Sequence, residues 1–145
     1  MAAKDLIMNA EIKGLSIMFH SGSYDRLYHG LSIALAALAL NREVKFFFSY
    51  WALEYLRREK GTKLVLDSEG NAHREILEKN IREGHILEIQ ELFNQAKRMG
   101  AKFYACTNSM GLLNIARNEL INEVDKSMGI TTFLTESASD QIMFI

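Results

Sequence analysis

Residues 102–111 have the sequence Lys-Phe-Tyr-Ala-Cys-Thr-Asn-Ser-Met-Gly, in which an apolar run gives way to polar residues at the chain's only cysteine, Cys106. The apolar run predicts a buried strand, and the polar residues predict the start of a helix. A thiol at this junction lies at the end of a strand and faces the positive end of the helix, which favours the thiolate. If the protein has an activity, we expect it at Cys106.

The composition predicts one globular domain spanning residues 1–145, with 48% hydrophobic and 24% charged residues. The net charge of -1 gives no electrostatic case for nucleic-acid or anionic membrane binding. One cysteine excludes an internal disulfide or a cysteine-rich zinc site and fits a reducing cytoplasm. The histidines lack metal-ligand spacing, so we assign no metal site. The longest apolar run, residues 31–40, is far shorter than the roughly 20 residues of a membrane span.

Apolar runs alternate with helical patterns along the rest of the chain. We expect strands at residues 15–20, 44–49, 102–106, 130–134 and 142–145, the last one buried. We expect helices at residues 25–40, 51–58, 85–99, 109–116 and 118–128, with a helical turn at 137–140. Residues 61–84 are ambiguous: 62–66 could form a short strand, and 72–82 a mobile helix or an excursion from the core. The alternation predicts an α/β fold with a mostly parallel sheet covered on both faces.

Right-handed crossovers place the carboxyl ends of parallel strands at one edge of the sheet, where open α/β sheets build their sites. We therefore expect three loops to meet there, at residues 20–24, 49–51 and 106–109. Asn108 and Ser109 can cap the helix after Cys106 and leave backbone N–H groups near the sulfur. Such an arrangement would stabilise a thiolate, a persulfide or a bound anion.

The other two loops supply candidate site residues with weaker signals. Ser21-Gly22-Ser23 offers amides and hydroxyls as an anion cradle, but it matches no phosphate-loop signature, and an ordinary strand-to-helix turn is the commoner explanation. His20 could lie near the thiol, although a neutral histidine that is hydrogen-bonded at a strand end is more common. Tyr50 and Trp51 could form an apolar wall or a partner contact, or simply pack in the core. Cys106 itself could be a small buried hydrophobe.

The sequence resembles the DsrE/DsrF-like (DsrEFH) family of small sulfur-transfer proteins, especially the single-domain DsrE-like branch sometimes labelled peroxiredoxin-related. The resemblance rests on four segments in order: residues 15–21 followed by a helix, 44–56 with an aromatic run and Trp51, 100–110 around the cysteine, and the ending 129–145. The phrase Phe103-Tyr104-Ala105-Cys106-x-x-Ser109-Met110 is its most specific part.

The resemblance implies a three-layer α/β/α sandwich of about five strands, flavodoxin-like in outline, and a homo-oligomer that is a trimer or larger. It also implies that Cys106 accepts sulfane sulfur as a persulfide or thiosulfonate. Donors or acceptors in such systems are a TusA-like carrier, a rhodanese or heterodisulfide reductase-like proteins. Some relatives carry a second cysteine in an earlier loop, where this chain has Ser49 and Tyr50, so Cys106 would work alone or with a thiol from another chain.

Three functions follow from these observations, and the first is favoured. The first is a cytoplasmic sulfur carrier of the sulfurtransferase type, in which Thr107, Asn108 and Ser109 stabilise the anion and His20 assists proton movement. It needs no cofactor besides the covalent sulfur adduct. The second is a single-cysteine redox enzyme or sensor, an oxidoreductase whose thiol is oxidised by peroxide, although no arginine is near Cys106 in the sequence. The third is a non-catalytic anion- or nucleotide-binding module that uses Ser21-Gly22-Ser23.

Overall fold

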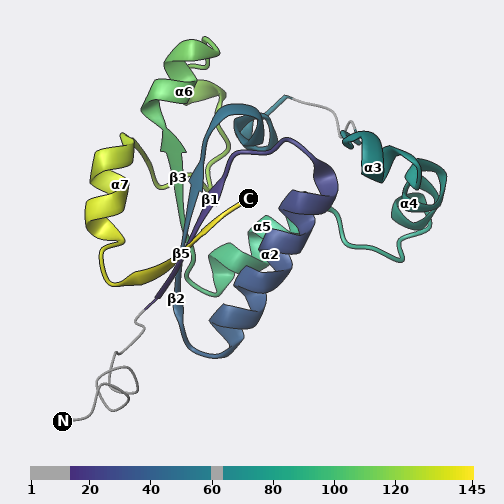
Figure 1. Cartoon of the computed structure of the whole chain (residues 1–145), viewed down its shortest axis with the longest axis horizontal. Coiled ribbons are helices and arrows are strands. Elements are labelled where there is room, and N and C mark those ends of the chain that lie inside the picture. The colour runs from purple at the N-terminus through teal and green to yellow at the C-terminus, as the bar shows by residue number, and fades with distance from the viewer. Residues whose placement is uncertain (1–13, 60–63) are drawn as a thin grey trace.

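A computed structural model describes residues 14–59 and 64–145 as an α/β fold built on a five-stranded sheet (Figure 1). All strand pairs are parallel, and the strand order is β4-β3-β2-β1-β5. The strands are β1 (Gly14–Phe19), β2 (Glu43–Phe48), β3 (Lys102–Cys106), β4 (Lys126–Met128) and β5 (Asp140–Phe144). The parallel sheet confirms the expected fold class.

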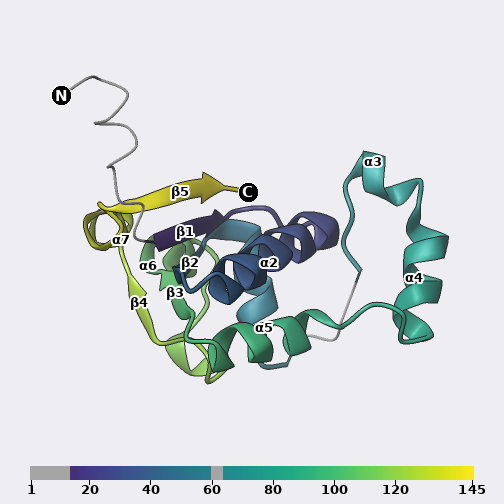
Figure 2. The same ribbon diagram turned by 90° about the horizontal axis from the view of Figure 1, so that it is seen from below.

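The helices make unequal layers on the two faces of the sheet. They are α2 (Tyr24–Ala39), η1 (Tyr50–Leu56, a 3-10 helix), α3 (Ser68–Asn71), α4 (Arg74–Arg82), α5 (Ile89–Arg98), α6 (Thr107–Leu112), η2 (Arg117–Glu119, a 3-10 turn) and α7 (Ile130–Glu136). The helices α2 and α5 cover one face side by side, whereas the short α7 lies on the other (Figures 1 and 2). We call these the α2/α5 face and the α7 face.

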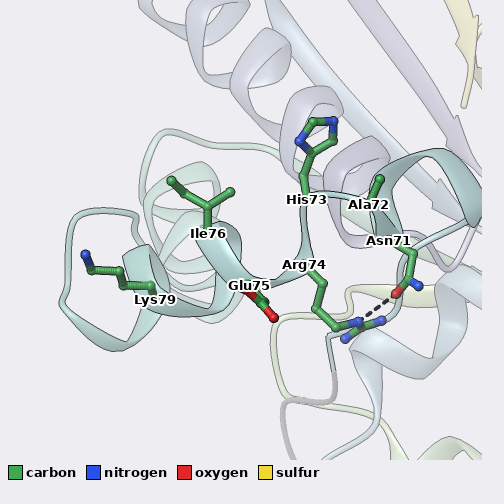
Figure 3. A pocket seen from close by; sticks show the side chains of 7 residues that line it. All are labelled: Asn71, Ala72, His73, Arg74, Glu75, Ile76 and Lys79. Carbon is green, nitrogen blue, oxygen red and sulfur yellow. Dashed lines mark hydrogen bonds between the residues drawn. The ribbon is translucent and has the colours of Figure 1, made fainter.

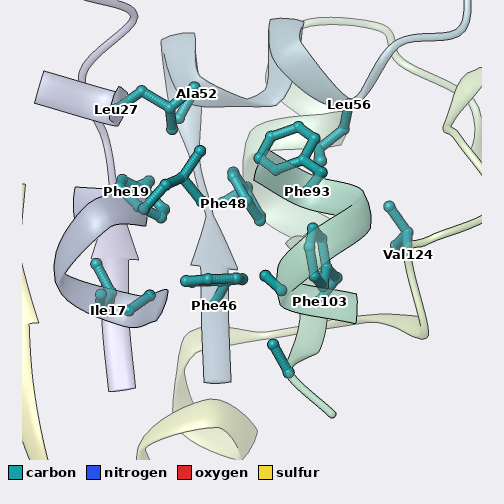
Figure 4. Packing of buried hydrophobic residues seen from close by; sticks show 14 of the residues in the cluster. Ile17, Phe19, Leu27, Phe46, Phe48, Ala52, Leu56, Phe93, Phe103 and Val124 are labelled. Atoms are coloured by element: carbon teal, nitrogen blue, oxygen red, sulfur yellow. The ribbon is translucent and has the colours of Figure 1, made fainter. Parts of the chain in front are cut away.

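The α2/α5 face carries the main core because alternate residues of each strand point into it (Figure 4). Phe46 and Phe48 of the central β2 are completely buried. The Phe46 ring meets Phe103 edge-on with centroids 5.0 Å apart, and Phe48 meets Phe93 of α5 in the same way at 5.7 Å. Burial of this many aromatic rings is the main stabilising contribution in the fold.

The α7 face holds a smaller apolar cluster and a polar network. Phe47 stacks on Phe133 of α7 with ring centroids 4.6 Å apart. Nearer the amino ends of the strands, Lys45 Nζ lies 2.7 Å from a carboxylate oxygen of Asp140, which also accepts a hydrogen bond of 2.7 Å from Ser16. Burial alone would raise the pKa of Asp140, but the Lys45 and Ser16 hydrogen bonds and the Lys45 and Arg42 charges outweigh it and hold that pKa below its usual range.

Residues 64–88, which we call the arm, project away from the α2/α5 side and contain α3 and α4 (Figure 2). No residue of the arm is buried. Its base is fixed to the start of α2 by a 2.8 Å hydrogen bond from the Tyr24 N–H to the Val65 carbonyl and by the exposed Arg26–Asp67 ion pair. The expected excursion from the core over residues 72–82 is therefore confirmed, with a helix at its centre.

The carboxyl-terminal third differs from the sequence-based expectation in three places. Residues 130–134 form the helix α7 rather than a strand, and the expected helix at 118–128 is replaced by η2, a loop and β4. Thr131, Thr132 and Phe133 favour a strand locally, but Phe133 buries its ring only if this segment packs as a helix on Phe47. The final strand is an edge strand with Phe144 69% exposed, not a buried one.

Other boundaries move by smaller amounts. The helix after Cys106 covers Thr107–Leu112 instead of 109–116, and the helix expected at 51–58 is the 3-10 helix η1. Of the possible strand at 62–66, residues 64–66 have no regular structure and the remainder lies outside the described residues. The strands β1, β2 and β3 and the helices α2 and α5 are where the sequence predicts them, within a few residues.

Candidate functional site

The candidate site lies at the carboxyl edge of the sheet, where the strand register brings three loops together. Phe19, Phe48 and Ala105 are register partners across β1, β2 and β3. The next residues along, His20, Ser49 and Cys106, therefore follow one another across the edge. The Ser49 N–H donates to the Phe19 carbonyl at 2.9 Å, and the Ala52 N–H donates to the His20 carbonyl at 3.3 Å, which fixes the first two loops together.

Cys106 is the last residue of β3 and the N-cap of α6, and only 6% of it is exposed. Its side chain makes no capping hydrogen bond to the helix. It belongs instead to the apolar cluster of the α7 face, with Phe47, Tyr104, Met128 and Phe133. The thiol thus lies at the expected strand end and helix start, but beneath an apolar cover rather than open to solvent. The adjacent apolar residues of β2 and β3 indicate that both faces of the sheet are covered, but they do not indicate which residues lie over the thiol.

The three polar residues after the cysteine take different positions. Thr107 and Asn108 are exposed in the first turn of α6, whereas Ser109 is 1% exposed. Neither Asn108 nor Ser109 caps the helix, because the helix begins before both of them, at Thr107. Among the described residues, none hydrogen-bonds to the buried Ser109 hydroxyl. Their contribution to stabilising an anion on Cys106 stays a prediction.

His20 is half-buried in an aromatic group at the same edge. Its ring centroid lies 4.8 Å from that of Tyr50 and 5.7 Å from that of Phe144. Because β2 separates β1 from β3, the backbones at His20 and Cys106 are about two strand spacings apart, roughly 10 Å. Proton transfer between them would need an intervening group, and this role of His20 stays a prediction. The sequence analysis did not place Phe144 in this aromatic group with His20 and Tyr50.

The Ser21-Gly22-Ser23 loop uses much of its hydrogen-bonding capacity within the chain. The Ser21 N–H donates to the Ile145 carbonyl at 3.2 Å, and the Ser23 N–H donates to the Ser21 hydroxyl at 3.1 Å. The Ser23 hydroxyl donates to Asp25. These contacts are typical of a strand-to-helix turn, and anion binding at this loop stays a prediction.

Tyr50 and Trp51 project at the start of η1, and both are partly exposed. Tyr50 has a backbone φ of +45°, a left-handed conformation that is costly for an aromatic residue and that is held here by its surroundings. A Cβ on Gly22 would come within 2.9 Å of the Trp51 Cβ, so glycine is needed for the first two loops to touch. The expected meeting of these loops is therefore confirmed.

Two hollows lie away from Cys106. One, of about 590 Å³, is lined only by residues 71–79 of the arm, whose side chains point in different directions (Figure 3). The other, of about 950 Å³, lies between the arm and the rest of the protein and is lined by charged side chains as well as by aromatic and aliphatic ones such as Tyr24, Trp51 and Phe93. We call the larger one the arm cavity.

Within residues 14–59 and 64–145, no group of three or more histidine, cysteine, aspartate or glutamate side chains is placed to hold a metal ion. The same residues contain no helix long and apolar enough to cross a membrane.

Comparisons with solved structures support the fold. The ychN protein of E. coli superposes with a TM-score of 0.66 over 92% of this chain and 100% of its own, at 14% identity. MTH1491, a protein of unknown function from Methanobacterium thermoautotrophicum, gives a TM-score of 0.59 over 93% of this chain and 100% of its own, at 13% identity. At these identities the likeness concerns the fold alone.

Sequence comparison gives the family. An uncharacterized Bacillus subtilis protein, YrkE, is 24% identical over 157 residues, which cover 93% of this chain and 98% of YrkE. The model of the DsrE/DsrF/DrsH-like family matches residues 11–74 and 62–145, which together include nearly the whole chain, the carboxyl-edge loops and Cys106. The chain therefore belongs to the DsrE/DsrF/DrsH-like family.

Proposed function

We propose that the protein is a cytoplasmic sulfur carrier that holds sulfane sulfur on Cys106 and passes it to a thiol of a partner protein. The observation that carries the proposal is the position of the only cysteine, at the carboxyl end of an inner strand and the first turn of a helix. Membership of the DsrE/DsrF/DrsH-like family supports it.

The chemistry requires only the thiol and a sulfur donor. With thiosulfate, the Cys106 thiolate attacks the outer sulfur, an S–S bond forms to Cys106, and the S–S bond of thiosulfate breaks to release sulfite. The persulfide then transfers its terminal sulfur to a partner thiolate, and Cys106 returns to the thiolate. With tetrathionate, the thiolate displaces thiosulfate and keeps the other half as a thiosulfonate. Neither route needs an added oxidant or cofactor.

The apolar cover over Cys106 has a consequence for this chemistry. Because only 6% of the residue is exposed, a donor reaches the sulfur only when part of the cover moves. Phe133 is the member of the cover that sits on the short helix α7, after Gly129. We expect opening of α7 to precede sulfur loading, and the apolar cover to shield the persulfide from water between transfers.

The test is intact-mass analysis of the reduced protein after separate incubation with thiosulfate, tetrathionate and polysulfide. A gain of roughly 32 Da is one sulfur atom, and a gain of roughly 112 Da is one thiosulfate group. Cys106→Ser is the matched control and should gain neither mass. Full loading of Cys106→Ser, or no loading of the wild type by any donor, would contradict the carrier function.

A second variant tests whether the cover controls access. Phe133→Ala opens space beside Met128 and Phe47, so it should load with sulfur faster than the wild type while reaching the same final gain in mass. Leu40→Ser, at a residue 75% exposed beyond the end of α2, is the control and should load at the wild-type rate. Equal rates in all three proteins would mean that donors reach Cys106 by another path.

The same proposal includes assembly into a homo-oligomer of three or more copies, so that neighbouring chains cover the α7 face. Four large apolar residues there are 44% to 69% exposed: Ile130 and Leu134 of α7, and Ile142 and Phe144 of β5. Ile142 and Phe144 pair in register with Ser16 and Met18 and so share one face of the edge strand. Light scattering coupled to gel filtration should show an oligomer that Phe144→Ser weakens, and a monomeric wild type would contradict the assembly.

A further inference from the structure

The arm cavity is large enough for a small organic molecule, and although Gly22 and Trp51 of the carboxyl-edge loops line it, Cys106 does not. Its volume of about 950 Å³ is at the upper end of the range of ligand pockets. It lies on the α2/α5 side, where Phe93 of α5 forms part of its wall, and it includes no member of the apolar cluster around Cys106. Its function would therefore be additional to sulfur transfer.

The walls of the arm cavity are mainly apolar and come from both the arm and the rest of the protein. The arm contributes Val65 and Ile81, and the opposite side contributes Tyr24, Trp51 and Tyr55. The arm has no buried residue of its own, although Ile81 and its neighbours form an apolar side of α4. A molecule between the two walls would give the arm the apolar contact that it lacks.

The charges around the cavity favour an uncharged ligand. Four glutamates and three arginines line it. Arg57 is paired with Glu54 and Glu119, and Arg58 donates to the Leu120 carbonyl and to Asn122. Because the four acidic and three basic side chains nearly balance, and Arg57 and Arg58 already have partners, the cavity has no strong preference for either sign.

One polar group in the wall has no partner. Tyr24 is 9% exposed, and its hydroxyl oxygen is closed off from solvent and has no hydrogen bond within the described residues, whereas the Tyr55 hydroxyl donates to the Gly22 carbonyl at 2.8 Å. A ligand in the cavity therefore reaches the Tyr24 hydroxyl only when the side chain or the arm shifts. Burial raises the pKa of Tyr24 to about 12, with smaller contributions from Tyr28 and Glu88, so the group remains a protonated donor at neutral pH. A buried donor without an acceptor is costly, and an acceptor on a ligand would remove that cost.

We propose that the arm cavity binds a neutral, mainly apolar organic molecule that carries an oxygen acceptor, and that the Tyr24 hydroxyl donates a hydrogen bond to that oxygen. The aromatic walls suit a flat ring system, and the arm closes one side of the ligand against Trp51 and Tyr55. Binding here does not depend on Cys106 or on the proposed sulfur transfer.

Two neutral dyes of similar chemistry test the proposal by fluorescence titration: Nile red, which has a carbonyl acceptor, and N-phenyl-1-naphthylamine, which has no oxygen. Both should bind the wild type and Cys106→Ser saturably, with one site per chain. Tyr24→Phe should weaken Nile red binding roughly five- to tenfold, the effect of one neutral hydrogen bond, and leave the naphthylamine unchanged. Its thermal unfolding midpoint should be no lower than that of the wild type, because the variant removes an unpaired hydroxyl.

Two further variants locate the dyes. Ile81→Ser, in the arm wall, should weaken both dyes, and Leu40→Ser, an exposed apolar residue that does not line the cavity, should weaken neither. The proposal is overturned if neither dye binds saturably, or if Tyr24→Phe binds Nile red as the wild type does. It is equally overturned if Ile81→Ser leaves both affinities unchanged. None of these results bears on sulfur loading of Cys106, which is measured separately by mass.

Discussion

The two faces of the sheet are built from the same three inner strands but are covered to different extents. Two helices, the 16-residue α2 and the 10-residue α5, cover one face, and its buried aromatic residues pack against one another (Figure 4). The seven-residue α7 covers part of the other face, where Cys106 lies beside an apolar cluster and a lysine–aspartate pair lies nearer the amino ends of the strands. A residue can therefore be buried to a similar degree on both faces and still differ in how easily its cover opens.

This difference assigns separate tasks to the two faces. The α2/α5 face stabilises the fold, because removing any of its rings leaves a cavity that the two helices cannot fill. Under the proposed function, the α7 face combines moderate stability with access, since we expect movement of one short helix to uncover the thiol.

Phe48→Ala should be the most destabilising substitution, at about 3–5 kcal/mol of unfolding free energy, because Phe48 is completely buried among Phe19, Phe93 and Phe103. Phe133→Ala on the α7 face should cost less, although Phe133 is equally buried, since α7 can settle onto the space left behind. Urea unfolding of both variants measures the difference. A loss for Phe133→Ala as large as that for Phe48→Ala would mean that the two faces are equally rigid.

Asp140→Asn should have the next largest effect, a loss of about 2–3 kcal/mol of unfolding free energy. The variant leaves the Lys45 ammonium without its carboxylate in a site where the Asp140 side chain is 4% exposed. Asparagine keeps the shape and can still accept from Ser16. Urea unfolding measures the loss, and Lys45→Met combined with Asp140→Asn should recover part of it. A loss below about 0.5 kcal/mol for the single variant would show that the pair contributes little to the α7 face.

The same pair predicts how stability depends on pH. The folded pKa of Asp140 is held below its ordinary value of about 3.9, so its stabilising contribution is complete above that value and disappears as the pH falls through the folded pKa. Asp125, hydrogen-bonded to Lys97 and to the Phe103 N–H, has a lowered pKa and acts in the same direction. Urea unfolding between pH 7 and pH 3 should show a smaller acid loss for Asp140→Asn than for the wild type. If the unfolding free energies of the two proteins fell in parallel with pH, other titratable groups would cause the loss of stability in acid.

The contrast between the faces also shows how far the sequence could predict this structure. The strands of the α2/α5 face were predictable because their apolar runs are continuous and bounded by turn residues, as with Phe46 to Phe48 before Ser49. The α7 segment was not, because Thr131 and Phe133 favour a strand locally and the helix depends on contacts of Phe133 with residues distant in sequence, such as Phe47 and Tyr104. The edge position of β5 depends on strand order, which no local pattern contains.

The candidate site divides in the same way. Alternating strands and helices were enough to predict that the loops after Phe19 and Phe48 meet beside the end of β3. The apolar cover over Cys106 was not predictable, since it brings together residues from four separate elements. The arm cavity has no sequence signal at all, because the partnerless Tyr24 hydroxyl becomes visible only once its neighbours are placed.

A substitution in the arm should change the unfolding free energy least. The arm would then mark the point where the stable α2/α5 side ends. Ile76 of α4 is 59% exposed, and Ile76→Ser should change the unfolding free energy by no more than about 0.5 kcal/mol. Hydrogen exchange should show the amides of α4 exchanging faster than those of α5, because the arm has no buried residue while Leu92, Phe93 and Ala96 anchor α5. A loss above about 1 kcal/mol, or equal protection of the two helices, would make the arm part of the cooperative core. The covered side of the sheet would then extend beyond α5, and the arm cavity would have a rigid outer wall.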